Sequence, residues 1–496
     1  MIKKADIITR TLEIIPGFFS WGILSFVFIL AVLHPISCAV LIIIFDFYWI
    51  IRTIYLTVLL VIAYKELSKH KDKDWLSACQ NLPARLEWQR IYQLVIFPIS
   101  QEGPEILRSS LEAIKQCHYS KDKMIVVLSF EEGNPKSREN AAVIENEFRN
   151  CFFGYIVTFH SDKISGEAHT KGANATWAAK KAREFIDSKG IPLENVIISC
   201  FDSDTCVEKE YFGCLAYNFL INPKPHQASY QPVPVYNNNI WYAPSFARIV
   251  EISSSFCQMI ESMRLEKFVT FSSHSMSFKT LVDIDYWPVD MISDDSVVYW
   301  KAYLYYKGEY VVRPLYITVS MDVAYSSNLF KTIWMQYKQK RRWAWGVENF
   351  PYVVSRFLTD KEIPLRKKII RSYHLLESHV TWATWAIMIT GMSSLPILFG
   401  GAFFAQIPIG YNLPRVTGLL FHFTLGASIV WILLSRTILP PRPADVRWGK
   451  NIIMLLEWLL VPFIIMVLGS IPALDAQTRL MLGENMEFYV TEKRRK

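Results

Sequence analysis

The chain has 496 residues, of which 51% are hydrophobic and 20% charged, with a formal net charge of +8. It is too apolar for an ordinary soluble protein and too charged for a bundle of membrane helices alone. Residues 14–45, 380–414 and 416–435 contain no Asp, Glu, Lys or Arg, whereas residues 64–376 carry most of the charge. These patterns exclude disordered, collagen-like and coiled-coil chains, and they predict an integral membrane protein with one large folded domain.

The basic residues cluster beside the apolar runs, for example at Lys367, Lys368 and Arg371. This placement favours anionic membrane lipids as partners and argues against nucleic acid. The eight cysteines form no CxxC pair and no set with zinc-site spacing, which predicts reduced structural thiols.

Residues 1–63 are predicted to form a membrane hairpin of two helices, at about 15–33 and 37–62, each longer than the ~20 residues needed to cross a bilayer. His34-Pro35 supplies the turn between them. Basic residues before the first helix, such as Arg10, place the N-terminus on the cytosolic side. A second apolar run follows the first at once, so an anchor is favoured over a signal peptide.

Residues 64–364 are predicted to form a cytosolic α/β domain. Apolar strands at 93–99, 123–130 and 196–201 are separated by helices that begin at Pro104 and near residue 138. Strands that alternate with helices indicate a mostly parallel, Rossmann-like sheet covered on both faces. Ligands bind such sheets beyond the carboxyl ends of the strands, so polar residues that follow a strand are the candidates for a site.

After this domain, the chain is predicted to return to the membrane. Residues 365–379 have the basic, amphipathic pattern of a helix in the membrane interface. Residues 380–473 are expected to hold about three spans, at 380–404, 416–436 and 452–473, followed by a basic tail at 474–496. The basic stretches on both sides of the last span favour the cytosol, so either that segment re-enters or the positive-inside rule fails once.

Two polar motifs follow predicted strands or open helices within the domain. Asp202 and Asp204 form an Asp-x-Asp after the strand at 196–201, where carboxylates can hold Mg²⁺ or Mn²⁺ and a diphosphate. A plain Asp-rich turn is the alternative. His169–Asn174 opens a helix whose free N–H groups and Lys171 suit a phosphate, although a simple capped helix start explains it too.

Two further motifs lie later in the chain. Asp294 and Asp295 begin a helix, where acidic side chains usually complement the helix dipole but one can also act as a general base. The segment Gln339–Trp343 (QKRRW) combines an amide, cations and an indole, which suit a diphosphate and a sugar ring. A basic patch with an aromatic membrane anchor is the alternative.

In this order and spacing, the motifs resemble those of the membrane-embedded family 2 glycosyltransferases, which include the cellulose, chitin, hyaluronan and poly-N-acetylglucosamine synthases. The matching stretches are His169–Asn174 (H-x-K-x-x-N), Asp202–Asp204, Gln231–Asn237 (like Q-T-P-x-x-F-N), Asp294-Asp295 (like T-E-D) and Gln339–Trp343 (Q-x-x-R-W). The likeness covers about residues 90–350 and the flanking helices. Two loops depart from the family pattern, because Ser100-Gln101-Glu102 lacks a tyrosine and Glu131-Glu132-Gly133 replaces Asp-Asp-Gly.

The resemblance implies a GT-A fold and an inverting, metal-assisted transfer from a nucleotide sugar, most simply a UDP-sugar. Asp295 would be the catalytic base, while Asp204 and Asp202 would hold Mg²⁺ or Mn²⁺. Donor-binding roles would fall to Glu102, Glu132, Lys171, Asp202, Gln339 and Arg342. Trp343 and Asp294 would meet the saccharide or lipid acceptor.

The expected function is transfer of a sugar to a growing β-linked polysaccharide or glycolipid in the cell inner or plasma membrane. Polymer export through the membrane helices is an extension of this hypothesis, with Asp46, Arg52 and Glu457 as candidates to line the path. A single-addition lipid glucosyltransferase of the ceramide type is one alternative, since it shares the Q/R-x-x-R-W box. A non-catalytic membrane scaffold derived from such an enzyme is the other, supported by the two altered loops.

Overall fold

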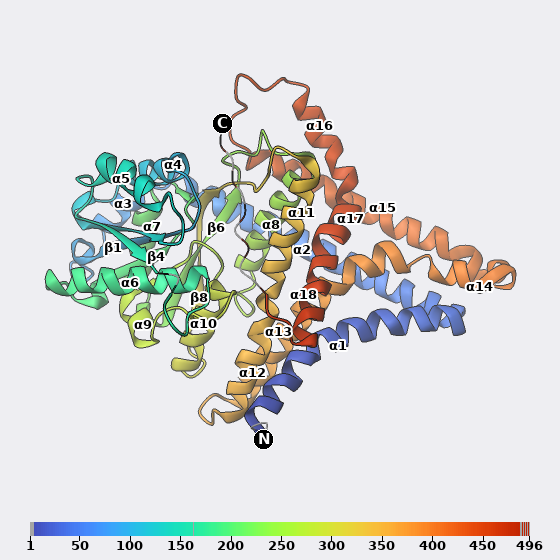
Figure 1. Ribbon diagram of the computed structural model, residues 1–496. Helices are drawn as coiled ribbons and strands as arrows, with labels where there is room; N and C mark the ends of the chain where they lie inside the picture. The colour runs from blue at the N-terminus through green and yellow to red at the C-terminus, as the bar shows by residue number, and fades with distance from the viewer. Residues whose placement is uncertain are drawn as a thin grey trace.

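The computed structural model describes residues 4–161, 163–486, 489, 491, 493 and 495. Figure 1 shows an α/β domain on one side and long helices that project away from it on the other. Residues 487, 488, 490, 492, 494 and 496 of the predicted basic tail lie outside the described residues.

An eight-stranded mixed sheet forms the centre of the domain, in the order β3-β2-β1-β4-β7-β6-β8-β5. The strands are β1 (Tyr92–Ile99), β2 (Met124–Glu131), β3 (Gly154–His160), β4 (Val196–Cys200), β5 (Cys206–Val207), β6 (Ala228–Tyr236), β7 (Ser275–Ser277) and β8 (Val311–Met321). β1 runs parallel to β2 and β4, β2 to β3, and β6 to β8. β7 is antiparallel to β4 and β6. The predicted mostly parallel sheet is confirmed.

Helices cover both faces of this sheet, as the alternating side chains of β1 require. Val95 and Phe97 pack in one core with α4 (Pro104–Lys115), α5 (Ser137–Phe148) and α7 (Tyr211–Ile221). Leu94 and Ile96 pack in a second core with α6 (Lys171–Ser188), α9 (Phe278–Asp283) and α10 (Asp294–Tyr305). The remaining helices of the domain are α3 (Trp75–Gln80), α8 (Ser245–Ser262), α11 (Leu329–Ala344) and α12 (Asn349–Thr359).

The other helices flank this domain, and most of them are apolar. They are α1 (Lys4–Leu33), α2 (Pro35–Lys71), α13 (Leu365–Ile387), α14 (Leu395–Gln406), α15 (Pro408–Thr437), α16 (Lys450–Leu456), α17 (Val461–Ile465) and α18 (Ile471–Leu482). Within the described part of the chain, four helical runs are long and apolar enough to cross a membrane: Ile7–Leu33, Pro35–Lys71, Leu365–Gln406 and Lys450–Leu482. In Figure 1, α1, α2, α14 and α15 project in one direction, away from the sheet.

The run from α16 to α18 lies across that direction in Figure 1. The loop before it contacts the α/β domain, where Trp241 Nε1 donates to Pro440 O at 3.1 Å and Tyr242 Oη to Asp445 at 2.9 Å. Lys493, after it, also reaches that domain. The stretches on both sides of the predicted span at 452–473 therefore contact the α/β domain.

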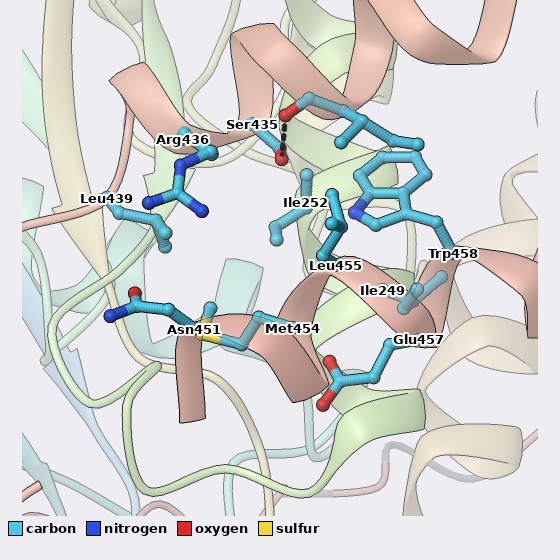
Figure 2. A pocket seen from close by; sticks show the side chains of 11 residues that line it. Ile249, Ile252, Ser435, Arg436, Leu439, Asn451, Met454, Leu455, Glu457 and Trp458 are labelled. Atoms are coloured by element: carbon cyan, nitrogen blue, oxygen red, sulfur yellow. Dashed lines mark hydrogen bonds between the residues drawn. The ribbon is translucent and has the colours of Figure 1, made fainter. Parts of the chain in front are cut away.

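Glu457 begins a short turn between α16 and α17 and is bound to Arg248 of α8. The two side chains are 5% and 1% exposed, and Arg248 Nε lies 3.0 Å from Glu457 Oε2. Figure 2 shows Glu457 at the edge of a small pocket with Ile249 and Trp458. This carboxylate, a candidate to line a polymer path, therefore joins α8 to the membrane-side helices.

We predict that Arg248→Met destabilises the protein by about 3–5 kcal/mol, because it leaves the Glu457 charge buried without a partner. The double variant Arg248→Met/Glu457→Leu should recover most of this loss, since both charges are then gone. Denaturant unfolding in detergent measures both. Arg183→Met, in an exposed ion pair on α6, serves as the control. An effect of Arg248→Met no larger than that of the control would contradict the prediction.

Candidate active site

A cavity of about 950 Å³ lies at the carboxyl ends of β1, β2, β4, β6 and β8. This is the edge at which open α/β sheets bind ligands. All but one of the predicted site residues line it: Glu102, Lys171, Asp202, Asp204, Asp294, Asp295, Gln339, Arg342 and Trp343. Five stretches that are distant in sequence are thus brought to one place.

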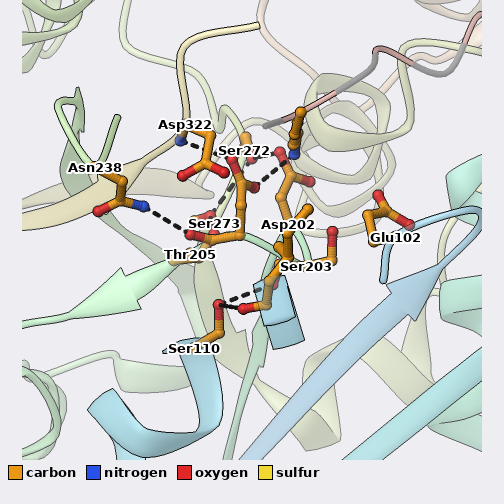
Figure 3. Close-up of polar contacts among 12 residues, drawn as sticks. Glu102, Ser110, Asp202, Ser203, Thr205, Asn238, Ser272, Ser273 and Asp322 are labelled. Carbon is orange, nitrogen blue, oxygen red and sulfur yellow. Dashed lines mark hydrogen bonds and ion pairs between the residues drawn. The ribbon is translucent and has the colours of Figure 1, made fainter. Parts of the chain in front are cut away.

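The Asp-x-Asp motif follows β4, and both carboxylates have partners. Figure 3 shows Asp202 beside Ser272. Asp202 Oδ1 lies 2.7 Å from Lys171 Nζ, and Asp202 Oδ2 accepts from Ser272 Oγ at 2.7 Å. Asp204 Oδ2 accepts from the backbone N–H of Asp322 at 2.8 Å. Burial raises the pKa of Asp202, but the ammonium groups of Lys171 and Lys493 and the hydrogen bonds from Lys171 and Ser272 together outweigh burial and hold that pKa below its usual range.

Lys171 bridges the Asp-x-Asp motif and the paired acids, because its Nζ also lies 3.1 Å from Asp295 Oδ1. It is the first residue of α6, whose start Thr170 caps by accepting from Ala173 N. At Gly172, a Cβ would lie 2.4 Å from Pro288 O and 2.8 Å from Asp294 Cβ. Only glycine permits this close approach of α6 to the residues before and in α10, which brings Lys171 to Asp295.

Four buried polar atoms on residues of the cavity wall have no partner in the described structure: Asn174 Oδ1, Ser203 Oγ, Asp294 Oδ2 and Gln339 Oε1. Asp294 and Gln339 are 3% and 6% exposed. Burial and the neighbouring charge of Asp295 raise the pKa of Asp294 well above its usual range, so Asp294 can donate a hydrogen bond. Unpaired buried polar atoms cost free energy, which makes these atoms candidates for hydrogen bonds to a ligand.

The QKRRW segment lies at the end of α11, and its three cations have different surroundings. Lys340 is buried, with its Nζ 3.5 Å from the Trp343 ring centroid and 3.2 Å from Glu251 Oε2. Arg341 lies 2.9 Å from Asp475 of α18. Arg342 and Trp343 line the cavity. Two of the three cations therefore hold the segment in place, and only Arg342 is on the cavity wall.

The structure places Glu131, not Glu132, on the cavity wall. Glu132 is exposed and pairs with Arg138 at 2.9 Å. Glu131 ends β2 and is held by Asn174 Nδ2 at 2.8 Å and His160 Nδ1 at 3.1 Å. The sequence could not distinguish Glu131 from Glu132, because both are glutamates. The position at which β2 ends decides which of them faces the cavity.

Two more cations that sequence reasoning assigned to a basic tail lie at the site. Lys493 Nζ is 2.6 Å from Asp204 Oδ1, and its backbone pairs with that of Ala324. Arg495 Nε is 3.0 Å from Asp322 Oδ1. Their basic character was visible in the sequence, but it is equally typical of residues beside a membrane.

His160 is held between two carboxylates, with its Nε2 2.8 Å from Glu167 and its Nδ1 facing Glu131. Burial lowers the pKa of His160, but these hydrogen bonds outweigh burial and raise it. The folded protein therefore binds this proton more tightly than the unfolded chain, whose histidine pKa is about 6.5. The resulting stabilisation is complete below about pH 6.5 and is lost as the pH rises through the folded-state pKa.

We predict that His160→Gln lowers the Tm by about 2–4 °C more at about pH 5.5 than at about pH 8.5. Thermal unfolding of both proteins in detergent measures the difference. His34→Gln, at the turn between α1 and α2, is the control substitution. A Tm loss that is the same at both pH values would contradict the assigned charge state.

Comparison with known proteins places the chain in a family. A model described as "Glycosyl transferase family group 2" matches residues 197–471, more than half of the chain. Poly-beta-1,6-N-acetyl-D-glucosamine synthase of Staphylococcus epidermidis is 22% identical over 346 residues, which cover 69% of this chain and 71% of the synthase.

Two solved structures resemble the chain more loosely. A mannosyltransferase from Pyrobaculum calidifontis, in complex with GDP-Man and Mn²⁺, is 13% identical, with a TM-score of 0.38 and coverage of 82% of this chain and 99% of its own. S. aureus TarS 1–349 is 15% identical, with a TM-score of 0.39 and coverage of 70% and 90%.

The family match agrees with the mixed sheet and the Asp-x-Asp after β4, so the expected GT-A fold is confirmed. Long apolar helices flank the fold, as in a membrane protein. The chain therefore belongs to glycosyl transferase family group 2 and is a membrane glycosyltransferase related to the polysaccharide synthases.

Proposed function

We propose that the protein transfers a sugar, with inversion, from a UDP-sugar to a hydroxyl of a growing β-linked saccharide, at a cavity that faces the cytosol. The observation that carries the proposal is the single cavity in which Lys171 joins Asp202 to Asp295, with Arg342 and Trp343 on its wall. The relationship to a poly-N-acetylglucosamine synthase favours a polymer over a single glycolipid addition and makes UDP-N-acetylglucosamine the first donor to test.

Asp295 is the proposed base. The acceptor oxygen forms its bond to the anomeric carbon as the bond from that carbon to the diphosphate breaks, and the acceptor proton passes to the Asp295 carboxylate. Lys171 orients this carboxylate from 3.1 Å. Asp294, with its raised pKa and unpaired Oδ2, would donate a hydrogen bond to the acceptor, and Trp343 would stack on the acceptor ring.

Gln339 and Arg342 would bind the departing diphosphate, whose negative charge grows as the bond breaks. Glu102 and Glu131 lie on the wall nearest the ends of β1 and β2, and we assign them to the nucleoside. This pocket differs from the family pattern because Glu131 is already held by Asn174 and His160.

Asp202 and Asp204 fit a divalent cation, Mg²⁺ or Mn²⁺. The described residues contain no cluster of three or more metal-ligating side chains, but Mg²⁺ is usually held by one or two carboxylates together with substrate phosphates. Such a cation would neutralise charge on the diphosphate. The ammonium of Lys493 is paired with Asp204 Oδ1, so the ammonium and the metal would compete for that oxygen.

We predict that Asp295→Asn lowers transfer by about 10²–10⁴-fold, because the acceptor proton has no base to receive it. Nucleotide binding should stay within about twofold, since a base acts only in the transition state. The measurement is nucleotide release and labelled-sugar incorporation by the protein in lipid, across UDP-, GDP- and TDP-sugars with Mg²⁺ or Mn²⁺. The size of the labelled product distinguishes a polymer from a single sugar on a lipid.

Asp290→Asn, at an exposed position five residues earlier, is the matched control. Full transfer by Asp295→Asn would remove Asp295 from the role of base. A wild-type protein that binds no nucleotide would favour the non-catalytic scaffold instead.

We predict that Lys493→Met lowers the metal concentration for half-maximal transfer by about tenfold, because a charged hydrogen bond contributes about 1.5–3 kcal/mol and its loss frees Asp204. Titration of Mn²⁺ against transfer rate measures this, with the exposed Lys361→Met as control. Loss of transfer at every metal concentration would contradict competition and make Lys493 a donor ligand.

A further inference from the structure

The N-terminus of α10, which carries Asp294 and Asp295, is held by a carboxylate from another element. Ser293 precedes the helix but makes no capping bond within it. Instead, Glu348 Oε1 accepts from the N–H of Ile292 at 3.1 Å, from the N–H of Ser293 at 2.8 Å and from Ser293 Oγ at 2.6 Å. A helix N-terminus favours hydrogen-bond acceptors and negative charge, so Glu348 caps α10 from a distant part of the chain.

The other oxygen of the same carboxylate faces the turn that follows α11. Glu348 Oε2 accepts from Trp345 Nε1 at 3.0 Å, and Trp345 is 4% exposed. Both residues belong to the short turn Trp345–Glu348, which directly follows α11. One side chain therefore joins the turn that directly follows α11, the helix that ends with the QKRRW segment, to the start of α10.

Asn349 adds a second connection between the same elements. Its Nδ2 donates to Ser296 Oγ at 2.7 Å, and its Oδ1 lies 3.3 Å from Ser293 Oγ, whose proton points to the nearer Glu348 Oε1. Ser293 and Ser296 flank Asp294 and Asp295 in sequence, so both ends of the acidic pair are anchored. The anchor is buried, because Asn349 is 4% exposed.

We infer that Glu348 is a positioning residue for sugar transfer, which fixes the first turn of α10 and hence the place of Asp295 relative to Gln339, Arg342 and Trp343. The inference rests on the proposed function, because it acts through the base assigned there. Of the described residues, those that line the cavity include Ser293 and Gly346 but not Glu348. Its effect on the reaction is therefore through α10 and not through contact with substrate.

The test uses the full-length protein in lipid, with UDP-N-acetylglucosamine or whichever donor the wild type uses. Glu348→Ala should lower kcat by about 10- to 100-fold, because small displacements of catalytic groups cost about this much, and should leave nucleotide binding within about twofold. Glu348→Gln keeps an oxygen for Ile292 and Ser293 and should recover most of kcat. Glu362→Ala, on a side chain 69% exposed, is the control.

Amide hydrogen exchange across residues 290–297 gives a readout that needs no activity. Exchange at Ile292 and Ser293 should accelerate in Glu348→Ala and return toward the wild-type rate in Glu348→Gln, because these amides donate to Glu348 Oε1. Unchanged exchange in Glu348→Ala would overturn the inference.

Two kinetic results would overturn it as well. One is an unchanged kcat in Glu348→Ala when Asp295→Asn is inactive. The other is a parallel loss of kcat, nucleotide binding and Tm without rescue by Glu348→Gln, which would make the residue purely structural. If the wild type transfers no sugar, the proposed function fails, and hydrogen exchange alone then decides whether Glu348 holds α10.

Discussion

The ammonium of Lys171, held between the carboxylates of Asp202 and Asp295, is the interaction on which the site depends. It connects the end of β4, the start of α6 and the start of α10. Burial disfavours this charge, but the two carboxylates outweigh burial and raise the pKa of Lys171 well above its usual range. Because one cation serves two carboxylates from different elements, displacement of any of these elements leaves a buried charge without its partner.

The second constraint comes from the membrane-side helices, which reach the cavity through α11. Lys340 is paired with Glu251 of α8 and lies against the Trp343 ring, while Arg341 is paired with Asp475 of α18. The cavity-wall residues Gln339, Arg342 and Trp343 thus lie on both sides of the two residues that fix the helix to its neighbours. These contacts fix Arg342 and Trp343 relative to α8 and α18. The packing of α18 against α11 therefore also holds part of the cavity wall in place.

Local sequence patterns predicted three of the strands, β1, β2 and β4, the helices between β1 and β2 and after β2, and nine of the residues on the cavity wall. This was achievable because β1, β2 and β4 are continuous apolar runs, and because the carboxyl ends of neighbouring parallel strands meet at one edge of a sheet. Local patterns could not predict which of Glu131 and Glu132 lines the cavity. Both are acids at the end of one strand, and only the orientation of Glu131 toward Asn174 and His160 distinguishes them.

The sequence by itself determined that the chain has apolar spans around an α/β domain, and which side chains are candidates for the chemistry, because periodicity and residue type are local properties. Only the tertiary structure decided their partners. Lys493 and Arg495 lie on Asp204 and Asp322, and Glu348 caps a helix that begins 54 residues before it. Such long-range ion pairs and hydrogen bonds follow from how the helices pack around the sheet, and packing depends on the whole set of contacts at once and not on any one stretch of residues.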